Sequence, residues 1–421
     1  MTATRRDFIA AVAAAVVAAR PAGAEETPAP SAAPPAPAGP DVAAFDQVWE
    51  LVRNRFYDPG LHGVDWSKMR DRYRPQAAEA RSRDDRANAI NAMLATLNAS
   101  HTRYYTRGDP AYYQLADIFA GALERRGLER LFPGGEVSYP GIGIFTETDD
   151  RARVFVAGAI EGAPARAADL MVGDEILSVD GRPFQPVESF RGKVGSKVSL
   201  SIRRAAAGAP MAIEAAPADL KPGEMFLRGL KESARVVQRG AVRVGYVHVW
   251  SYASRRYQSA LEDLIADGRL RDADALVWDL RDGWGGAQPY YLGLFNARSP
   301  TMQVADREGE TGFVGAKWRK PVAALINGGT RSGKEVLAYG FREYAIGPLI
   351  GSRTEGAVLA ATAFLIGDEG LLLLAVEDVL IDGKRLEGVG VEPTIAVPFD
   401  RRYAAGADPR LDRALEALSR S

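Results

Sequence analysis

The segment from Asn327 to Glu335 contains residue types that could carry out catalysis. It reads Asn-Gly-Gly-Thr-Arg-Ser-Gly-Lys-Glu, and it lies between an apolar stretch and a helical pattern that begins at Ser332. A serine at the start of a helix lies where backbone N–H groups point outward and can stabilise a developing oxyanion. Gly333 would supply one of these N–H groups. Ser332 is therefore a candidate nucleophile.

The same segment nearly matches a phosphate-binding loop. Gly328 and the pair Gly333-Lys334 have the spacing of that motif, which requires Ser or Thr at the next position to hold Mg²⁺. Here the next residue is Glu335, whose carboxylate would face the phosphates. A third interpretation is a glycine-rich turn that ends in a capping serine. The segment alone leaves all three interpretations open.

A second glycine-rich segment, Asp279 to Gly286, follows another apolar stretch. It reads Asp-Leu-Arg-Asp-Gly-Trp-Gly-Gly and should lie at the carboxyl end of a strand, where open α/β sheets carry their sites. Glycine lets a backbone approach a ligand closely, so the N–H of Gly286 is a candidate second oxyanion donor. A plain strand-to-helix turn would have the same local sequence.

A serine nucleophile needs a base, and the chain offers three histidines: His62, His101 and His248. His62 lies in a glycine-flanked turn, and His248 lies in an alternating pattern typical of a packed strand. His101 follows Ser100 directly after the predicted end of a helix near Asn98. A lone histidine often has only a structural role. Among the three, His101 has the most suitable position for a base.

The periodicity of the chain predicts three regions that must position these residues. The first is helical: Asp41 should cap a helix, and a second helix should run from about Ser82. Their apolar stripes are Phe45, Trp49, Val52 and Phe56, then Ile90, Met93, Leu94 and Leu97. The second region, from about Ser138, alternates with period two. It predicts strands at Gly141–Phe145, Val154–Val156, Val172–Val179 and Val198–Ile202, with a short helix opening at Ala163.

The third region alternates strands with helices, which predicts an α/β core. The expected strands are 242–250, 275–280, 321–326 and 346–351, and the expected helices are 257–266 and 332–344. Two later strands are expected at 361–366 and 371–376, followed by a turn at Asp382-Gly383. The glycines at 141 and 143 lack the third glycine and the following helix of a dinucleotide-binding fingerprint.

Composition narrows the possible functions. The chain has 421 residues, 53 basic and 54 acidic side chains, and a net charge of −1. This balance argues against a nucleic-acid or membrane-surface binder. The absence of cysteine excludes thiol catalysis, disulfides and cysteine–zinc sites. We predict neither a cofactor nor a metal.

The N-terminal residues resemble an export signal. Arg5 and Arg6 precede the apolar run 10–19, and Ala22-Gly23-Ala24 offers a cleavage site, so residues 1–24 are interpreted as a signal peptide. The paired arginines favour a twin-arginine signal over a general secretory one, and we expect a periplasmic location. The apolar run is too short to span a membrane. Residues 25–40, rich in Pro and Ala, should form an extended linker.

Several ordered motifs together resemble those of the C-terminal processing peptidases and their relatives, including the tricorn core protease. Residues 141–144 and 172–181 look like a PDZ domain with its carboxylate-binding loop. Residues 279–286 resemble the family's D-L-R-x-N-x-G-G turn, and residues 326–335 resemble its nucleophile motif. Residues 350–356 and 387–393 resemble two further segments of the family. The similarity covers nearly everything from Asp41 to Pro398.

One position departs from the processing branch of this family. That branch uses a serine–lysine dyad, with the lysine directly after the last glycine of the 350–356 segment, and here the residue is Ala357. Lys334 is expected to point away from Ser332, because residues two apart at a helix start diverge. The tricorn branch instead carries an L-N-x-S-H motif, which matches residues 97–101. This resemblance implies that His101 is the base, oriented by Ser100 and by Glu387.

The resemblance implies a multidomain α+β and α/β fold with a ClpP/crotonase-like catalytic core. The predicted layout is an N-terminal helical domain at 41–134, a PDZ-like β domain at 135–222 and an α/β peptidase core at 223–421. The catalytic residues would be Ser332, His101, Glu387 and Ser100, and the oxyanion hole would be Gly286 and Gly333. Gly141, Ile142, Gly143 and Ile144 would bind peptide.

The predicted function is that of an exported serine endopeptidase. Its partners would be polypeptide substrates, recognised at their C-termini through the PDZ-like domain by strand addition, and not nucleic acid. The alternative is a catalytically inactive relative that only binds peptides or apolar ligands. It is suggested by the sequence Thr-Arg-Ser-Gly-Lys at residues 330–334, where the family repeats Ser and Ala.

Overall fold

A computed structural model describes residues 40–124, 127–295, 302–305, 311–314, 317–368 and 370–420. The predicted signal peptide and all of the predicted linker except Pro40 lie outside these ranges. The chain divides into two compact units. The first contains residues up to Arg107, Leu115–Glu136 and Ala360–Asp378, and the second contains Gly108–Gln114, Val137–Leu359 and Val379–Ser421. Within the described ranges, no helix has the length and apolar character needed to cross a membrane.

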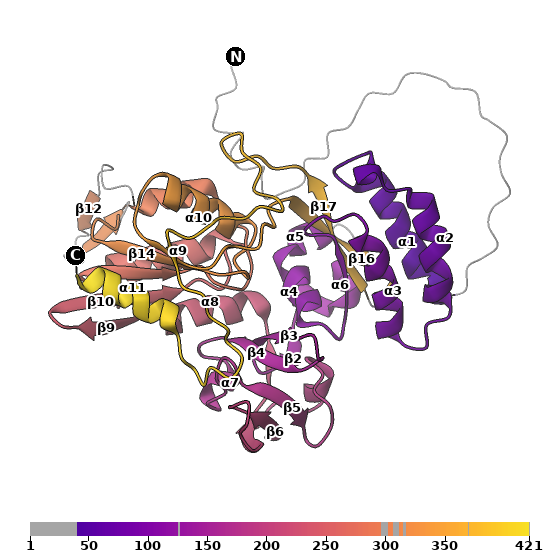
Figure 1. The fold of residues 1–421 in the computed structure, drawn as a ribbon, viewed down its shortest axis with the longest axis horizontal. Helices are drawn as coiled ribbons and strands as arrows, with labels where there is room; N and C mark the ends of the chain where they lie inside the picture. The colour runs from indigo at the N-terminus through magenta and orange to yellow at the C-terminus, as the bar shows by residue number, and fades with distance from the viewer. Residues whose placement is uncertain are drawn as a thin grey trace, which may run out of the picture. The chain divides into compact units, whose positions relative to one another are not determined.

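The first unit combines helices with a three-stranded antiparallel sheet in the order β1-β17-β16 (Figure 1). Its helices are α1 (Pro40–Arg55), η1 (Leu61–Gly63), α2 (Trp66–Ala78), α3 (Arg83–Ala95), α5 (Ala120–Glu124), α6 (Leu128–Leu131) and η2 (Pro133–Gly135). Its strands are β1 (Arg103–Thr106), β16 (Ala360–Ile366) and β17 (Gly370–Glu377). Helix α4 (Pro110–Ile118) is divided between the units after Gln114. The predicted apolar stripes of α1 and α3 are buried.

Two details of this unit differ from expectation. The first helix begins at Pro40, one residue before the predicted cap Asp41, whereas Ser82 caps α3 by accepting the N–H of Asp85 at 3.0 Å. Strands β16 and β17 confirm the two late strands, but β17 also pairs with β1 of the N-terminal region. Pairing across more than 250 residues cannot be seen in local periodicity. The predicted domain layout stays a prediction.

The second unit contains a five-stranded antiparallel sheet in the order β3-β4-β5-β6-β7. These strands are β3 (Ile144–Thr148), β4 (Val154–Ala159), β5 (Glu175–Val179), β6 (Val198–Arg203) and β7 (Met211–Ala215), with α7 (Pro164–Ala167) and η3 (Glu188–Phe190). A short pair joins β2 (Tyr139–Gly141) to β8 (Ala218–Leu220). The single strand predicted at 141–145 is wrong. It is broken at Ile142-Gly143, because Gly143 has a φ of +76°.

The same unit contains a six-stranded sheet in the order β18-β15-β14-β11-β10-β9. Its strands are β9 (Arg235–Arg239), β10 (Val242–His248), β11 (Ala275–Asp279), β14 (Val322–Ile326), β15 (Leu349–Gly351) and β18 (Ile395–Ala396). All neighbours are parallel except β9 and β10. Every residue of β11 and β14 is buried, as expected for central parallel strands. The four predicted core strands are therefore confirmed, with β15 shorter than expected.

Helices cover both faces of this sheet (Figure 1). They are α8 (Pro222–Ser233), α9 (Arg255–Ala266), η4 (Pro289–Phe295), α10 (Gly333–Glu343) and α11 (Pro409–Ser419), and β12 (Met302–Ala305) pairs with β13 (Thr311–Val314). Helix α11 packs its apolar residues against Val277 of β11. Phe341 of α10 contacts the ring of Trp278, the next residue along that strand. Because successive strand residues point to opposite faces, α10 and α11 lie on opposite faces.

Candidate active site

Ser332 lies in the turn between β14 and α10, immediately before the first helical residue, and it is half-buried. Its φ of +56° and ψ of −133° lie in a region that non-glycine residues rarely adopt. Its N–H donates to Ala357 O at 2.8 Å, which holds the strained residue in place. Strain of this kind is concentrated at functional sites, and a sharp strand-to-helix turn is a known way to expose a nucleophilic serine.

The glycines of the second segment pack directly against this turn. A Cβ built on Gly285 would lie 2.5 Å from Ser332 Cβ, and one built on Gly333 would lie 2.3 Å from Ala287 N. Only glycine fits at these two positions. The backbone around Gly286 therefore runs beside the backbone that carries Ser332. Gly286 itself has a φ of +90° and is exposed, so its backbone can face a ligand.

Glu335 organises the same turn from within the protein, a role that the sequence analysis did not predict. Its buried carboxylate accepts hydrogen bonds from Thr354 Oγ1 at 2.5 Å, Gly356 N at 2.7 Å and Ala357 N at 2.7 Å. Burial raises the pKa of Glu335, although these hydrogen bonds oppose the rise. The carboxylate thus ties the segment that accepts the Ser332 N–H to the first turn of α10. The sequence feature that could have indicated this role is the glutamate three residues after Ser332, within the first turn of the helix.

Lys334 is fully buried, and its Nζ donates to Asp282 O at 2.7 Å. Burial lowers the pKa of this ammonium to about 7, while the carboxylates of Asp279 and Asp282 act in the opposite direction. The side chain therefore connects α10 to the 279–286 segment. A lysine held in this way is not presented to a phosphate, which argues against the phosphate-binding interpretation.

A second connection joins the two glycine-rich segments through Asn327. Its Oδ1 accepts the N–H of Asp282 at 3.2 Å, and its Nδ2 donates to the Asp282 carboxylate at 3.0 Å. Arg401 donates to the same carboxylate at 3.2 Å. At the start of the 279–286 segment, Arg281 forms ion pairs with Asp279 and Asp408. Burial would raise the pKa of Asp279, but the positive charge of Arg281 holds it far below its usual range. Both glycine-rich segments are thus held from several sides.

The predicted base and its orienting groups lie on loops. His101 follows α3 in a half-buried turn with a φ of +51°, and its Nδ1 lies 3.0 Å from Ser100 Oγ. Glu387 Oε2 accepts the N–H groups of Val358 at 2.9 Å and Leu359 at 3.3 Å, next to the residue that accepts the Ser332 N–H. His101 belongs to the first compact unit, and Ser332 and Glu387 belong to the second.

The other two histidines have the structural surroundings expected from the sequence. His248 is 5% exposed, stacks on Trp250 with ring centroids 3.7 Å apart, and bonds Arg281 O through Nε2. His62 contacts Leu97 O through Nδ1 at 2.7 Å, so it supports the end of α3. In the described ranges, no group of three or more His, Cys, Asp or Glu side chains could hold a metal ion.

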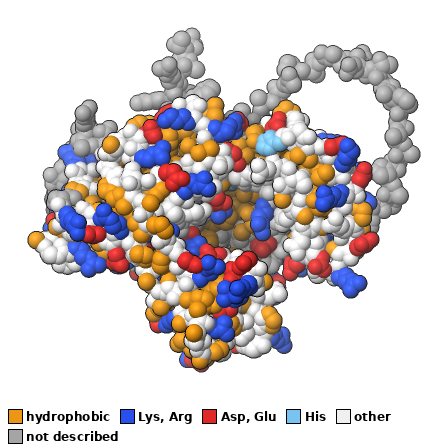
Figure 2. All heavy atoms as spheres, in the orientation of Figure 1, with side chains coloured by type: hydrophobic (Ala, Val, Ile, Leu, Met, Phe, Trp, Pro, Cys, Tyr) orange, Lys and Arg blue, Asp and Glu red, His pale blue; other side chains and the backbone are white. Residues whose placement is uncertain are grey.

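Residues Gly141 to Ile144 line a small cleft beside β3, the edge strand of the five-stranded sheet. Its other walls are Pro110, Tyr139, Thr146, Phe184, Pro186 and Phe190. The edge strand leaves backbone groups on one side available for pairing, and the walls are mainly apolar. On the face drawn in Figure 2, basic and acidic side chains are interspersed, in keeping with the net charge of −1.

In comparisons with known proteins, two regions of the chain match models of protein families. Residues 243–397 match the model of peptidase family S41, and residues 43–95 match the tricorn protease C1 domain. The chain is 23% identical over 372 residues to the chloroplastic carboxyl-terminal-processing peptidase 3 of Arabidopsis thaliana, covering 83% of this chain and 67% of that protein. It is 25% identical over 386 residues to tricorn protease homolog 1 of Streptomyces coelicolor, covering 88% of this chain and 34% of that protein.

Solved structures show that the fold is shared. A crystal structure of the tricorn protease aligns with a TM-score of 0.50 and 18% identity, covering 89% of this chain and 36% of that one. The structure of mature CPAF aligns with a TM-score of 0.50 and 12% identity, covering 90% and 98%. The mixed α/β, multi-sheet architecture is thus that of these peptidases. The chain is therefore similar to serine peptidases of the S41 and tricorn groups: residues 243–397 match the peptidase family S41 model and residues 43–95 match the tricorn protease C1 domain.

Proposed function

We propose that this protein is an exported serine endopeptidase that cleaves peptides or unfolded proteins with Ser332 as the nucleophile. The observation that carries the proposal is the strained turn at Ser332, which starts α10 and is packed against Gly285 without room for a side chain. A helix start with exposed backbone N–H groups stabilises developing negative charge. We assign the N–H groups of Gly286 and Gly333 to the oxyanion hole.

In this proposal His101 is the general base, oriented by Ser100 and Glu387. Two contacts support it: Ser100 Oγ lies 3.0 Å from His101 Nδ1, and Glu387 is bonded to residues 358–359, next to Ala357. Ala357 cannot accept a proton, and Lys334 is bonded to Asp282 O, so neither supplies a base. The Ser–His–Glu assembly would follow the usual order of nucleophile, base and orienting acid.

The five-stranded sheet would act as a PDZ-like peptide-binding domain. The cleft lined by Gly141, Ile142, Gly143 and Ile144 lies beside an edge strand, and this arrangement suits an extended peptide that adds a strand to the sheet. Substrates would be polypeptides recognised at their C-termini. Export rests on the N-terminal sequence alone, with its paired arginines and apolar run.

The alternative of a catalytically inactive binding protein is not favoured, because the similar proteins are named as peptidases. A fluorophosphonate probe, which labels activated serines, tests the proposal. We expect the wild-type protein to be labelled and Ser332→Ala to lose all labelling. Ser82→Ala, which removes only the cap of α3, should be labelled like the wild type. A folded wild-type protein that is neither labelled nor active on peptides would contradict the proposal.

A further inference from the structure

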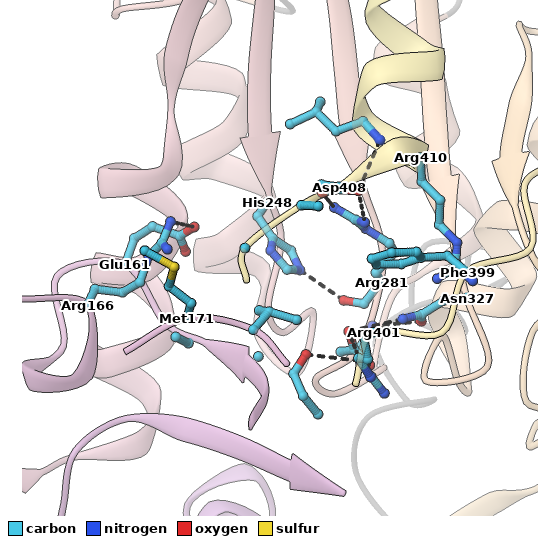
Figure 3. Close-up of a pocket in the computed structure, with 18 of the residues that line it drawn as sticks. Glu161, Arg166, Met171, His248, Arg281, Asn327, Phe399, Arg401, Asp408 and Arg410 are labelled. Carbon is cyan, nitrogen blue, oxygen red and sulfur yellow. Dashed lines mark hydrogen bonds and ion pairs between the residues drawn. The ribbon is translucent and has the colours of Figure 1, made fainter. Parts of the chain in front are cut away.

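The second unit contains a larger cavity than the peptide cleft, with a volume of about 910 Å³ including its open mouth. It lies at the carboxyl ends of β10, β11 and β14, on the side opposite to α10, and β4 and α7 of the five-stranded sheet complete its wall. Five arginines line it: Arg166, Arg235, Arg281, Arg401 and Arg410. Figure 3 shows Arg281, Arg401 and Arg410 on one side and Arg166 with Glu161 on the other.

Most of the cationic groups on the inner side already have carboxylate partners. Arg281 pairs with Asp279 and Asp408, and Arg401 pairs with Glu147 and Asp282. These pairs complete the structure and leave little charge for a ligand. They also place the guanidinium groups of Arg281 and Arg401 in the same cavity as Arg410.

Arg410 differs from Arg166, Arg281 and Arg401, which form ion pairs, and it differs from the exposed Arg235 in being buried. It is 9% exposed, and no carboxylate lies within 4 Å of its guanidinium nitrogens in the part of the chain that the structure describes. Its Nε donates to Val397 O at 3.1 Å and its Nη2 to Ser352 Oγ at 3.2 Å. Nη1 has no protein partner among the described residues. Burial and the nearby positive charge of Arg281 lower the pKa of Arg410, although the more distant carboxylates of Asp408 and Asp282 oppose this effect.

A buried guanidinium without an anion is costly, and a carboxylate is the group that it binds best, through two parallel hydrogen bonds. The cavity wall next to Arg410 is also apolar. Phe399 lies with its ring centroid 5.9 Å from the guanidinium carbon, and Leu411 and Trp250 line the same space. These surfaces fit a ligand that carries an apolar body beside its charge.

We propose that this cavity binds an organic carboxylate with an apolar or aromatic body, and that Arg410 holds the carboxylate. The ligand could be the C-terminal end of a peptide or a small organic acid, since both present the same chemistry. The site is distinct from the cleft at residues 141–144. Asp282 and Asn327, whose hydrogen bond joins the two glycine-rich segments, form part of its wall. It requires neither Ser332 nor peptide cleavage.

Binding of N-acetyl-L-phenylalanine to the full-length protein, measured by calorimetric titration, tests this. We expect the acid to bind at least about tenfold more tightly than its amide, because only the acid forms charge-assisted hydrogen bonds. Arg410→Gln should weaken acid binding by a similar factor. Arg269→Gln, which removes an exposed arginine outside the cavity, should bind like the wild type. Phenylacetate and a short peptide with a free or amidated C-terminus distinguish the two sources of carboxylate.

Three results would overturn the proposal. They are equal affinities for acid and amide, wild-type affinity in Arg410→Gln, and loss of acid binding in Gly143→Ala but not in Arg410→Gln, which would assign the acid to the peptide cleft. Should Arg410→Gln fail to fold, Phe399→Ala takes its place. It removes an apolar wall and should weaken acid binding several-fold, whereas unchanged binding in that variant would exclude the cavity.

Discussion

Lys334 shows how burial changes the chemistry of a single residue near Ser332. Its ammonium has a pKa of about 7 in the folded protein and an ordinary value of 10.5 in the unfolded chain. Between these two values the unfolded state holds more protons than the folded state. Because of this one group, the free energy of unfolding should therefore rise with pH over this window. Below pH 7 both states hold the proton, so this group should add no pH dependence there.

We predict that Lys334→Met removes this rise. The difference in unfolding free energy between wild type and variant should grow by about 1.4 kcal/mol for each pH unit from about 7 to 10. Urea denaturation at a series of pH values measures it. Lys231→Met, an exposed lysine of α8, controls for the loss of one positive charge. Parallel pH profiles of wild type and Lys334→Met would show that Lys334 titrates like a solvent-exposed lysine.

Among the structural elements, the connection between β2 and β3 shapes the cleft that we propose binds peptide. Gly143 has a φ of +76°, and a Cβ at this position would lie 2.3 Å from Ala163 Cβ. Gly181, in the turn after β5, has nearly the same φ of +73° but no heavy atom within 4 Å of such a Cβ. The two glycines thus share the backbone requirement and differ only in packing.

We predict that Gly143→Ala lowers the affinity for a peptide with a free C-terminus at least several-fold, because the loop must move away from Ala163. Gly181→Ala should leave the affinity unchanged, since its backbone strain of about 1 kcal/mol is local to another turn. Fluorescence polarisation with a labelled peptide, in a Ser332→Ala background that prevents cleavage, measures both. Equal affinities in the two variants would remove residues 141–144 from peptide binding.

At the scale of the whole molecule, the proposed base and the proposed nucleophile belong to different compact units. His101 belongs to the unit that contains α1, α2, α3 and the β1-β17-β16 sheet, and Ser332 belongs to the other. If His101 is the base, activity depends on the first unit. The rate should then fall as pH decreases, because the protonated imidazole cannot accept the proton of Ser332.

We predict that His101→Ala loses nearly all turnover while its circular dichroism spectrum and unfolding midpoint stay close to those of the wild type. His62→Asn is the matched control, because its side chain supports Leu97 O and lies outside the proposed machinery. It should lose stability and keep its rate. Peptide cleavage at near wild-type rate by a folded His101→Ala variant would exclude His101 as the base.

Most of the strands and helices around the candidate active site could be predicted from the amino-acid sequence. Continuous apolar runs between glycine-rich turns predicted β10, β11, β14 and the start of α10, because central parallel strands are buried on both faces. The same patterns located Ser332 at a helix start and His101 after a helix end. Helix α2 was not predicted, because its buried residues are too few to form a clear apolar stripe; they are Trp66, Tyr73 and Ala77.

Only the tertiary structure decided which distant groups meet. The carboxylate of Glu335 is bonded to Thr354, Lys334 reaches Asp282, Arg281 pairs with Asp408, and β17 pairs with β1. The packing of α11 against the sheet places Arg410 where no described carboxylate lies within ion-pair distance of its guanidinium group. Local periodicity reports which face of an element is buried, but partners and pKa values depend on atoms brought together from far along the chain.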